Sequence, residues 1–406
     1  MVSIELGDIQ AARERFDDEA VVRHTPVETS RSLSRMSGAD VHLKMEHLQR
    51  TGSFKTRGAY NKLKQVAAAG GVTRVVAASA GNHAQGVALA ATKVGIDSTI
   101  VMPKNAPQAK IDATRDYGGD VELHGSNFPE AMTYARTLTQ ADDTIFVHAY
   151  DDPDIAAGQG TIGLEIYEDL PSVDTVIVPI GGGGLIGGIS TALKALDSDI
   201  RVVGVQADSA STVPESLDKG GPHSIDHPNT IADGIATGGI SQLTYELIEA
   251  HVDEVITVSD DEISNGILIL LERAKQLVEG AGAVSIAALL SDKLDVEGET
   301  VVPLLCGGNI DMSMLQTVLT HALTERCQLL RLRVKIEDQP GKMTEISGII
   351  AEQGANIRDV RHDRAVDDLR VGEAYLVFQV VTSGTEHAES IRGAIEGAGY
   401  EVERMN

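Results

Sequence analysis

The chain has 406 residues, with 60 Asp and Glu against 34 Lys and Arg, so its formal net charge is −26. So acidic a surface repels nucleic acid and anionic membranes, and neither is an expected partner. No apolar run is long enough to span a membrane. The start of the chain has neither the basic stretch nor the apolar core of a signal peptide. Two cysteines, Cys306 and Cys327, are too few for a disulfide framework. A cytoplasmic protein of two or three domains is expected.

The acidic excess also bears on the salt that the protein tolerates. Only 13 of the basic residues are lysines, and tryptophan is absent. Salt screens the repulsion between like charges on such a surface. We therefore expect a halophilic type of surface, and an acidic enzyme without salt adaptation is the alternative.

Apolar runs alternate with helical patterns from about residue 40 to 325. Near-continuous apolar strands separated by helices are typical of parallel sheets that helices cover on both faces. The pattern predicts an α/β fold with two open α/β subdomains and mostly parallel sheets. The first domain is expected over residues 1–325, with a smaller subdomain at about 45–150. Strands are predicted at residues 41–46, 74–79, 98–103, 174–180, 201–207, 253–259 and 300–306, with more near 121 and 145, and helices at 82–94, 107–116 and 184–196.

A second domain is predicted over residues 327–406. The strand pattern QLLRLRVKIED stops at Gln339-Pro340-Gly341. A helix pattern, two strand patterns, a second helix pattern and a final strand pattern follow. This β-α-β-β-α-β succession is typical of the split-βαβ, ferredoxin-like arrangement.

Lys55 stands in the segment TGSFKTRGA, residues 51–59, after the first predicted strand and at the start of a helix. Both the positive end of that helix and the charge of Arg57 would disfavour a protonated amine. A lysine with a lowered pKa suits Schiff-base chemistry. A solvated lysine at a helix start is the structural alternative.

Two turns rich in small residues follow predicted strands and open helices. Residues 79–86 read SAGNHAQG, and residues 180–185 read IGGGGL. Small residues let the backbone approach an anion, which amides at a helix N-terminus then bind. Four consecutive glycines cost conformational entropy, which favours a phosphate-binding role over a plain turn. The run lacks the Gly-Lys-Ser/Thr ending of a Walker loop. In the first turn, Asn82 acting as a helix cap is the alternative.

The last predicted strand of the first domain ends in LCGGN, residues 305–309, where Cys306 is a candidate site residue. A buried structural cysteine is the alternative. No Ser-His-Asp order, C-x-x-C pair or H-E-x-x-H pattern occurs, and no metal is expected.

These four motifs, in this order and spacing, resemble the fold type II, tryptophan-synthase-β-like family of pyridoxal-phosphate (PLP) enzymes. The resemblance covers nearly the whole chain. Thr56 after the lysine, followed by Arg-Gly-Ala, is most similar to the threonine and serine dehydratases. The resemblance implies that residues 1–325 form the catalytic domain and that Lys55 binds PLP as a Schiff base.

The resemblance also implies the other roles in the site. Asn82 contacts the ring hydroxyl of PLP, and Cys306 contacts its pyridine nitrogen. A neutral thiol there makes the ring a weaker electron sink, which favours loss of a β leaving group. The cofactor is held by Phe54, Lys55, Asn82, Gly181, Gly182, Gly183, Gly184, Leu185 and Cys306, and the substrate carboxylate by Ser79, Ala80, Gly81 and Asn82.

The implied reaction converts L-threonine to 2-oxobutyrate and ammonia, and L-serine to pyruvate, in isoleucine biosynthesis or threonine catabolism. A serine racemase is an alternative, but the family's racemases have a second serine where this chain has Ala80. An amino-acid sensor without activity is another, against which the intact motifs argue. Glu279 is either a substrate or ion contact or an acid at a helix start. Gln206 and Thr212 replace the acids that bind a divalent ion in the racemases.

In the second domain, DQPG at residues 338–341 and GANI at residues 354–357 resemble the ACT domain. The resemblance implies a regulatory site for a small ligand at a paired interface, formed by Asp338, Gly341 and Asn356. Isoleucine or valine is the expected ligand, and a homo-oligomer, dimer or tetramer, the expected assembly. A purely structural dimerisation domain is the alternative.

Overall fold

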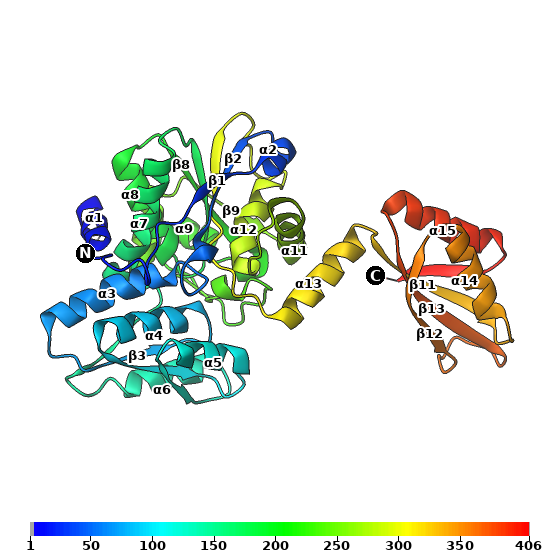
Figure 1. Cartoon of the computed structure of the whole chain (residues 1–406), viewed down its shortest axis with the longest axis horizontal. Helices are drawn as coiled ribbons and strands as arrows, with labels where there is room; N and C mark the ends of the chain where they lie inside the picture. The colour runs from blue at the N-terminus through cyan, green and yellow to red at the C-terminus, as the bar shows by residue number, and fades with distance from the viewer. Residues whose placement is uncertain (1–3, 406) are drawn as a thin grey trace. The chain divides into compact units, whose positions relative to one another are not determined.

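The computed structural model describes residues 4–405, which form two compact units that divide after Asp311 (Figure 1). The first unit contains two sheets. The larger has the strand order β1-β2-β10-β7-β8-β9, and all its neighbouring pairs are parallel except β1 with β2. The smaller is wholly parallel in the order β5-β4-β3-β6. The strands of the larger sheet are β1 (Val27–Thr29), β2 (Asp40–Lys44), β7 (Thr175–Pro179), β8 (Arg201–Ala207), β9 (Glu254–Val258) and β10 (Thr300–Pro303), and those of the smaller sheet are β3 (Arg74–Ala78), β4 (Asp97–Met102), β5 (Asp120–Leu123) and β6 (Thr144–Phe146).

Helices pack on both sheets. In the smaller subdomain, α4 (Asn82–Val94) and α6 (Phe128–Thr137) contact strands β3 and β4, and α5 (Gln108–Asp116) contacts β5. No helix of residues 4–405 is long and apolar enough to cross a membrane. The remaining elements of the first unit are α1 (Leu6–Glu14), α2 (Arg31–Ser37), η1 (Glu46–Leu48), α3 (Lys55–Ala69), α7 (Pro153–Asp169), α8 (Gly184–Leu196), η2 (Asp208–Ala210), α9 (Val213–Lys219), η3 (Asp233–Ile235), α10 (Gln242–His251), α11 (Asp260–Ile269), η4 (Leu270–Ala274) and α12 (Gly280–Leu289).

The predicted strands are present with small shifts at their ends. Buried strands such as β7, whose five residues are all buried, gave the near-continuous apolar runs seen in the sequence. Strand β10 ends at Pro303 rather than at residue 306. Beyond it the chain makes only isolated bridges, first Lys44 with Leu304 and then Ser53 with Gly307. The second bridge joins the end of this strand to the lysine segment.

Three helices of the first unit cross closely at glycines. A Cβ atom on Gly158 of α7 would lie 2.6 Å from the Cα atom of Gly58 on α3. A Cβ atom on Gly188 of α8 would lie 2.2 Å from the carbonyl oxygen of Ala156 on α7. Real Cβ contacts are not this short, so these crossings require glycine. Helix α7 is thereby held between α3, which starts at Lys55, and α8, which starts in the glycine run.

The second unit is a four-stranded antiparallel sheet with two helices, in the order β12-β13-β11-β14. Along β11, Leu332 and Val334 are buried, whereas Arg331 and Arg333 on the other face are only half-buried. Helices α14 and α15 complete the core on the apolar face. The predicted β-α-β-β-α-β succession is present. Its elements are β11 (Leu329–Glu337), α14 (Lys342–Glu352), β12 (Asn356–Asp363), β13 (Glu373–Val381), α15 (Thr385–Gly397) and β14 (Glu401–Met405), preceded by α13 (Met312–Glu325).

Helix α13 falls in the second unit, so this unit begins at residue 312 and not near residue 327, where the strand pattern begins. The sequence pattern changes only where the sheet starts, because α13 reads as one more helix in the alternation of strands and helices that precedes it.

Gly188→Ala is expected to destabilise the protein by about 1–3 kcal/mol, because the added methyl group meets the backbone of α7. The free energy of unfolding in urea, followed by circular dichroism, measures this. Gly7→Ala is the matched control, since Gly7 lies in α1 with no atom within 4 Å of its added Cβ. The control should be neutral or gain up to about 1 kcal/mol. Equal stabilities for the two variants would contradict the close crossing.

Candidate active site

Lys55 is the first residue of α3, and backbone pairing fixes it against the end of the last strand of the large sheet. The N–H group of Phe54 donates to the carbonyl oxygen of Cys306 at 3.2 Å. Ser53 forms a bridge with Gly307. The Nζ atom of Lys55 donates to the carbonyl oxygen of Ala149 at 3.2 Å. The amine therefore lies among segments that are far apart in the sequence.

The pKa of Lys55 is lowered, as expected, but burial is the main cause rather than the expected positive charges nearby. The side chain is half-buried, and its burial lowers the pKa to about 8. Cys306 and Glu279 act in the opposite direction. The prediction that Arg57 lowers this pKa is wrong, because the guanidinium group of Arg57 is neutralised by two carboxylates. Loss of hydration is thus the main cause of the shift.

The turn before α4 lies beside the lysine. Gly81 is the N-cap of α4, and its N–H group donates to Oγ of Ser79 at 3.1 Å. One turn into α4, a Cβ atom on Gly86 would lie 3.1 Å from the backbone of Lys55. This close crossing of α3 and α4 places the first turn of α4 near the amine. In that turn the N–H group of Ala84 donates to the carbonyl oxygen of Gly81 at 3.1 Å, whereas the amides of Asn82 and His83 come too early in the helix for a helical partner and can bind an anion.

Asn82 is oriented by two residues that the sequence did not assign to its surroundings. Its Nδ2 atom donates to Oε1 of Glu279 at 2.6 Å, and its Oδ1 atom accepts from Nδ2 of Asn309 at 2.8 Å. Asn309 also donates to the carbonyl oxygen of Thr51 at 2.7 Å. Asn309 is the last residue of the motif LCGGN, so its place in the sequence was a usable signal. Glu279 is at a helix start, as the N-cap of α12, and its contact with Asn82 also favours a role in the site.

Cys306 is 2% exposed, and its thiol donates to the carbonyl oxygen of Ala281 at 3.3 Å. Burial raises the pKa of this thiol well above its usual range, so it stays neutral. Burial also raises the pKa of Glu279, whose Oε1 atom would lie 2.3 Å from a Cβ atom on Gly307. The lysine thus faces a neutral thiol and a carboxyl group with a reduced tendency to ionise.

The glycine run lies between β7 and α8, where Gly183 is the N-cap of α8 with φ of 88°. A Cβ atom on Gly182 would lie 2.2 Å from the ring of Tyr150, so a side chain cannot be accommodated there. Tyr150 also adjoins Gly184. The residue before it, Ala149, accepts the hydrogen bond from Lys55. Residues 149 and 150 thereby connect the lysine with the glycine run, although no sequence pattern marked them.

Several polar atoms here suit a bound group. The hydroxyls of Thr51, Ser53 and Thr56 are buried without a hydrogen-bond partner among residues 4–405. Unpaired buried hydroxyls are costly, so a ligand near them would be stabilised. The free amides at the start of α8 suit a phosphate, and the amine of Lys55 suits an aldehyde. The residues therefore fit PLP. A cavity of about 550 Å³ adjoins this region and is lined in part by Thr51, Gln85 and Asn309.

The place matching the racemase ion site is used differently. Oε1 of Gln206 accepts hydrogen bonds from the backbone N–H groups of Thr212 at 3.0 Å and Val213 at 2.9 Å. Across residues 4–405, no group of three or more His, Cys, Asp or Glu side chains could hold a metal ion.

The three residues predicted as a regulatory site are not brought together within one chain. Asp338 accepts from Nε of Arg364 at 2.6 Å, near the end of β11 that pairs Glu337 with Glu373. Asn356 pairs with Val381 at the other end of β13, roughly 25 Å away. Gly341 lies near Asp338, as the N-cap of α14. The resemblance to the ACT motifs identified these three residues in the sequence, but it could not show where on the sheet each of them lies.

Known proteins are similar to this chain both in sequence and in fold. A profile of the family described as "Pyridoxal-phosphate dependent enzyme" matches residues 19–307. The L-threonine ammonia-lyase of Thermotoga maritima is 44% identical over 98% of this chain and 99% of its own length. The processed form of threonine deaminase isoform 2 from Solanum lycopersicum has a TM-score of 0.74 at 36% identity, covering 78% of this chain and 87% of that chain. Maize serine racemase has a TM-score of 0.74 at 32% identity, covering 80% and 99%.

In the cofactor-free protein, Lys55 is expected to react with acetic anhydride at a rate that rises with pH through a midpoint near 8, since only the neutral amine is nucleophilic. Mass spectrometry of the labelled peptides measures the rate. Lys62 is the matched control. Although burial lowers its pKa, hydrogen bonds with Asp152 and Asp154 raise it overall, so its midpoint should lie higher. A midpoint for Lys55 near the ordinary value of 10.5 would contradict the account of its burial.

Proposed function

We propose that this chain, which belongs to the family of pyridoxal-phosphate dependent enzymes, converts L-threonine to 2-oxobutyrate and ammonia. The β-hydroxyl leaves as water, and hydrolysis of the resulting imine takes up one water and releases ammonia. The observation that carries the proposal is the half-buried amine of Lys55, with its lowered pKa, beside Asn82 and the glycine run. L-serine would give pyruvate in the same way. The extra methyl group of threonine is worth only about 1–3 kcal/mol in a pocket, so both substrates are compatible with one site.

The cofactor would be held at both ends. Lys55 would bind its aldehyde, the amides of residues 181–185 its phosphate, and Asn82 its ring hydroxyl. Phe54 lies next to the lysine and is 9% exposed, which suits an apolar contact with the ring. Cys306 would lie at the ring nitrogen. When bound, PLP withdraws electrons from the substrate's Cα atom and so weakens the bonds to it.

The side chains of this chain would then direct the reaction. Ser79 and the amides at the start of α4 bind the substrate carboxylate. The amine of Lys55, once released by the incoming substrate, removes the proton from Cα. Its lowered pKa keeps a useful fraction of the amine neutral near pH 8. The neutral thiol of Cys306 would not keep the ring nitrogen protonated, so the ring would be a weaker electron sink. Departure of the β-hydroxyl is then favoured over reactions that need a long-lived carbanion.

The racemase alternative has weaker support, although a racemase is among the similar structures. Racemisation needs an acid or base on each face of the cofactor. This chain has Ala80 beside Ser79, and Ala80 packs against the apolar core of the small subdomain. A methyl group cannot transfer a proton, so the second face lacks a donor at this position.

Purified protein with PLP is expected to show an absorption band of the lysine-bound cofactor and to form 2-oxobutyrate from L-threonine. Lys55→Ala should lose both, because no other amine replaces it at the site. Absorbance and a keto-acid assay measure these, with chiral analysis of residual serine as a test for racemisation. A band without keto acid, or unchanged turnover in Lys55→Ala, would contradict the proposal.

We also propose that the second unit is an ACT regulatory domain whose ligand is isoleucine or valine. Its β-α-β-β-α-β succession and its loop at Gly341, with φ of 97°, support this. Because Asp338 and Asn356 lie at opposite ends of the sheet, a site that contains both needs two copies of the unit. The proposal therefore includes a homo-oligomer, a dimer or a tetramer.

Millimolar isoleucine or valine is expected to change the KM for L-threonine, because an effector at paired units would act on the catalytic units of the same oligomer. Steady-state kinetics with and without each amino acid measure the effect. Asp338→Asn, which weakens the loop's contact with Arg364, should reduce it. Identical kinetics at all effector concentrations would leave the second unit with a purely structural role.

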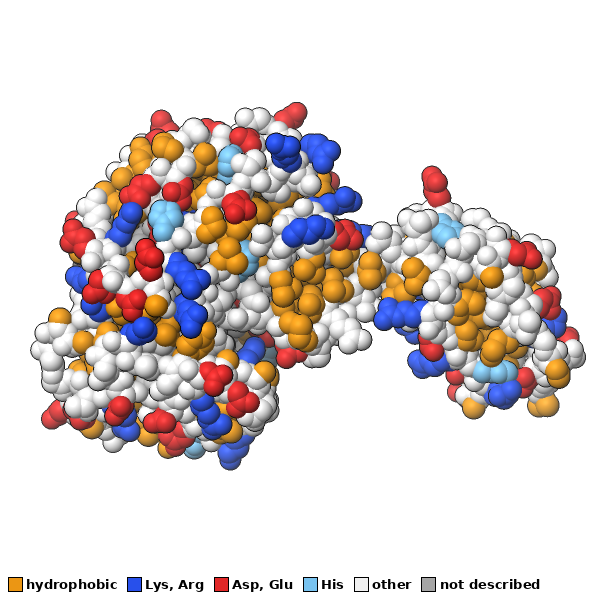
Figure 2. All heavy atoms as spheres, viewed as in Figure 1, with side chains coloured by type: hydrophobic (Ala, Val, Ile, Leu, Met, Phe, Trp, Pro, Cys, Tyr) orange, Lys and Arg blue, Asp and Glu red, His pale blue; other side chains and the backbone are white. Residues whose placement is uncertain are grey.

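The acidic composition suits activity at high salt. In Figure 2, Asp and Glu side chains are scattered over the visible face, with Lys and Arg side chains between them. Dispersed charges of excess sign repel one another, and salt screens that repulsion. We propose that the enzyme works best in concentrated salt.

A further inference from the structure

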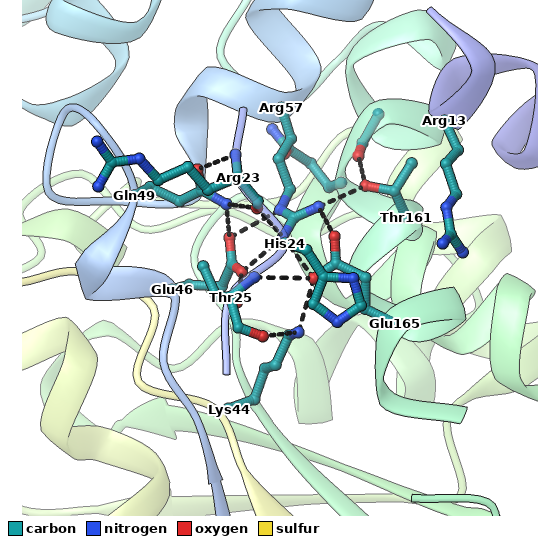
Figure 3. A network of polar contacts seen from close by, with 12 residues as sticks. Arg13, Arg23, His24, Thr25, Lys44, Glu46, Gln49, Arg57, Thr161 and Glu165 are labelled. Atoms are coloured by element: carbon teal, nitrogen blue, oxygen red, sulfur yellow. Dashed lines mark hydrogen bonds and ion pairs between the residues drawn. The ribbon is translucent and has the colours of Figure 1, made fainter. Parts of the chain in front are cut away.

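We propose that Arg57 is a positioning residue for Lys55. It lies two residues after the lysine, in the first turn of α3, at the centre of a buried set of charged side chains (Figure 3). We call this set the Arg57 cluster, and it consists of Lys44, Glu46, Arg57 and Glu165. The inference rests on the proposed function of Lys55 as the cofactor-binding amine.

The guanidinium group of Arg57 is completely buried and makes two paired contacts with carboxylates. Its Nε and Nη2 atoms donate to the two oxygens of Glu46, both at 2.8 Å. Its Nη1 and Nη2 atoms donate to the two oxygens of Glu165 at 2.7 and 2.8 Å. Nη1 also donates to the hydroxyl of Thr161 at 3.1 Å. Only the planar fork of arginine can make both pairs at once.

These contacts join three elements around the lysine segment. Arg57 belongs to α3, Glu165 to α7, and Glu46 to the short helix η1 that follows strand β2. The close crossing of α3 and α7 at Gly58 and Gly158 brings Arg57 within reach of Glu165. The start of α3 is therefore fixed in direction as well as in distance.

Lys44 is the second basic side chain of the Arg57 cluster, and with Arg57 it balances the charges of Glu46 and Glu165. Its Nζ atom donates to Oε2 of Glu165 at 2.6 Å and to the carbonyl oxygen of Thr25 at 2.7 Å. The Arg57 cluster thus has two basic and two acidic side chains. Their opposite charges compensate one another in a buried region. For Arg57, burial lowers the pKa, but the two glutamates raise it overall, and the group stays charged.

Lys55 is consequently held from both sides. On one side the N–H group of Phe54 and the bridge of Ser53 fix it to the strand end at Cys306 and Gly307. On the other side Arg57 fixes the first helical turn to α7 and η1. A lysine at position 57 would keep the charge but lose one of the two paired contacts. The turn would then shift, and the amine of Lys55 would lose part of its enclosure.

The test is Arg57→Lys, compared with Lys44→Met. Lys44 contacts Glu165 and Thr25, neither of which belongs to α3, so its loss should affect stability alone. Both variants are expected to lower Tm. Only Arg57→Lys should lower kcat for L-threonine, by about 10- to 100-fold, with a far smaller change in KM, because a misplacement of about 1 Å acts on the reaction more than on binding.

The second measurement is independent of the cofactor. In the cofactor-free protein, the labelling midpoint of Lys55 should move in Arg57→Lys from about 8 towards its ordinary value, and should stay in Lys44→Met. If the midpoint moves in Arg57→Lys but the wild-type protein forms no 2-oxobutyrate, the proposed function is refuted and the positioning role is left intact.

If Arg57→Lys does not fold, Glu46→Gln replaces it in the test. Glu46→Gln keeps the shape of the Glu46 side chain and weakens one paired contact of Arg57. It should shift kcat and the midpoint in the same directions by less. A folded Arg57→Lys or Glu46→Gln with the wild-type kcat and midpoint, or a Lys44→Met that changes them as much, would overturn the positioning role.

Discussion

The enclosure of one amine is the constraint on which the site depends. An ammonium group loses hydration when protein surrounds it, and the neutral amine is then favoured. The structure achieves this for Lys55 by pairing the segment before it with the end of a buried strand, next to a thiol that burial keeps neutral. The side chain stays half-buried, as its proposed role in binding the cofactor requires.

Arg57 and Lys55, two basic residues in the same helical turn, differ in how far nearby acids compensate their charge. Arg57 is completely buried, yet two carboxylates compensate its charge fully. Lys55 is less buried, and its nearby acid, Glu279, has a raised pKa of its own and so compensates little. The first arrangement gives rigidity, and the second gives a reactive amine. Placing them two residues apart lets the rigid group orient the reactive one.

The fold was largely predictable from the sequence. Strands such as β7 and β8 are buried on both faces, so they appear as apolar runs, and the glycine run and the asparagine turn each follow a strand, where such sites lie. The alternation of buried and half-buried residues along β11 likewise revealed the second unit.

The contacts within the site were not predictable in the same way. Asn82 and Glu279 are 197 residues apart in the sequence, and Arg57 and Glu165 are 108 apart. Local patterns contain no information on which distant side chains meet. The same limit explains why Arg57 was expected to act on Lys55 through its charge, and why the sequence could not place Asp338 and Asn356 at opposite ends of the sheet. Sheet register and helix crossings decide both questions.

The most direct test of the central claim is to identify the amine that binds the cofactor. The protein is loaded with PLP, reduced with borohydride to make the bond permanent, digested, and mapped by mass spectrometry. We predict that, of the 13 lysines, the one in the peptide containing residues 51–57 carries the pyridoxyl group. A label on a different lysine, or one spread over surface lysines, would contradict it.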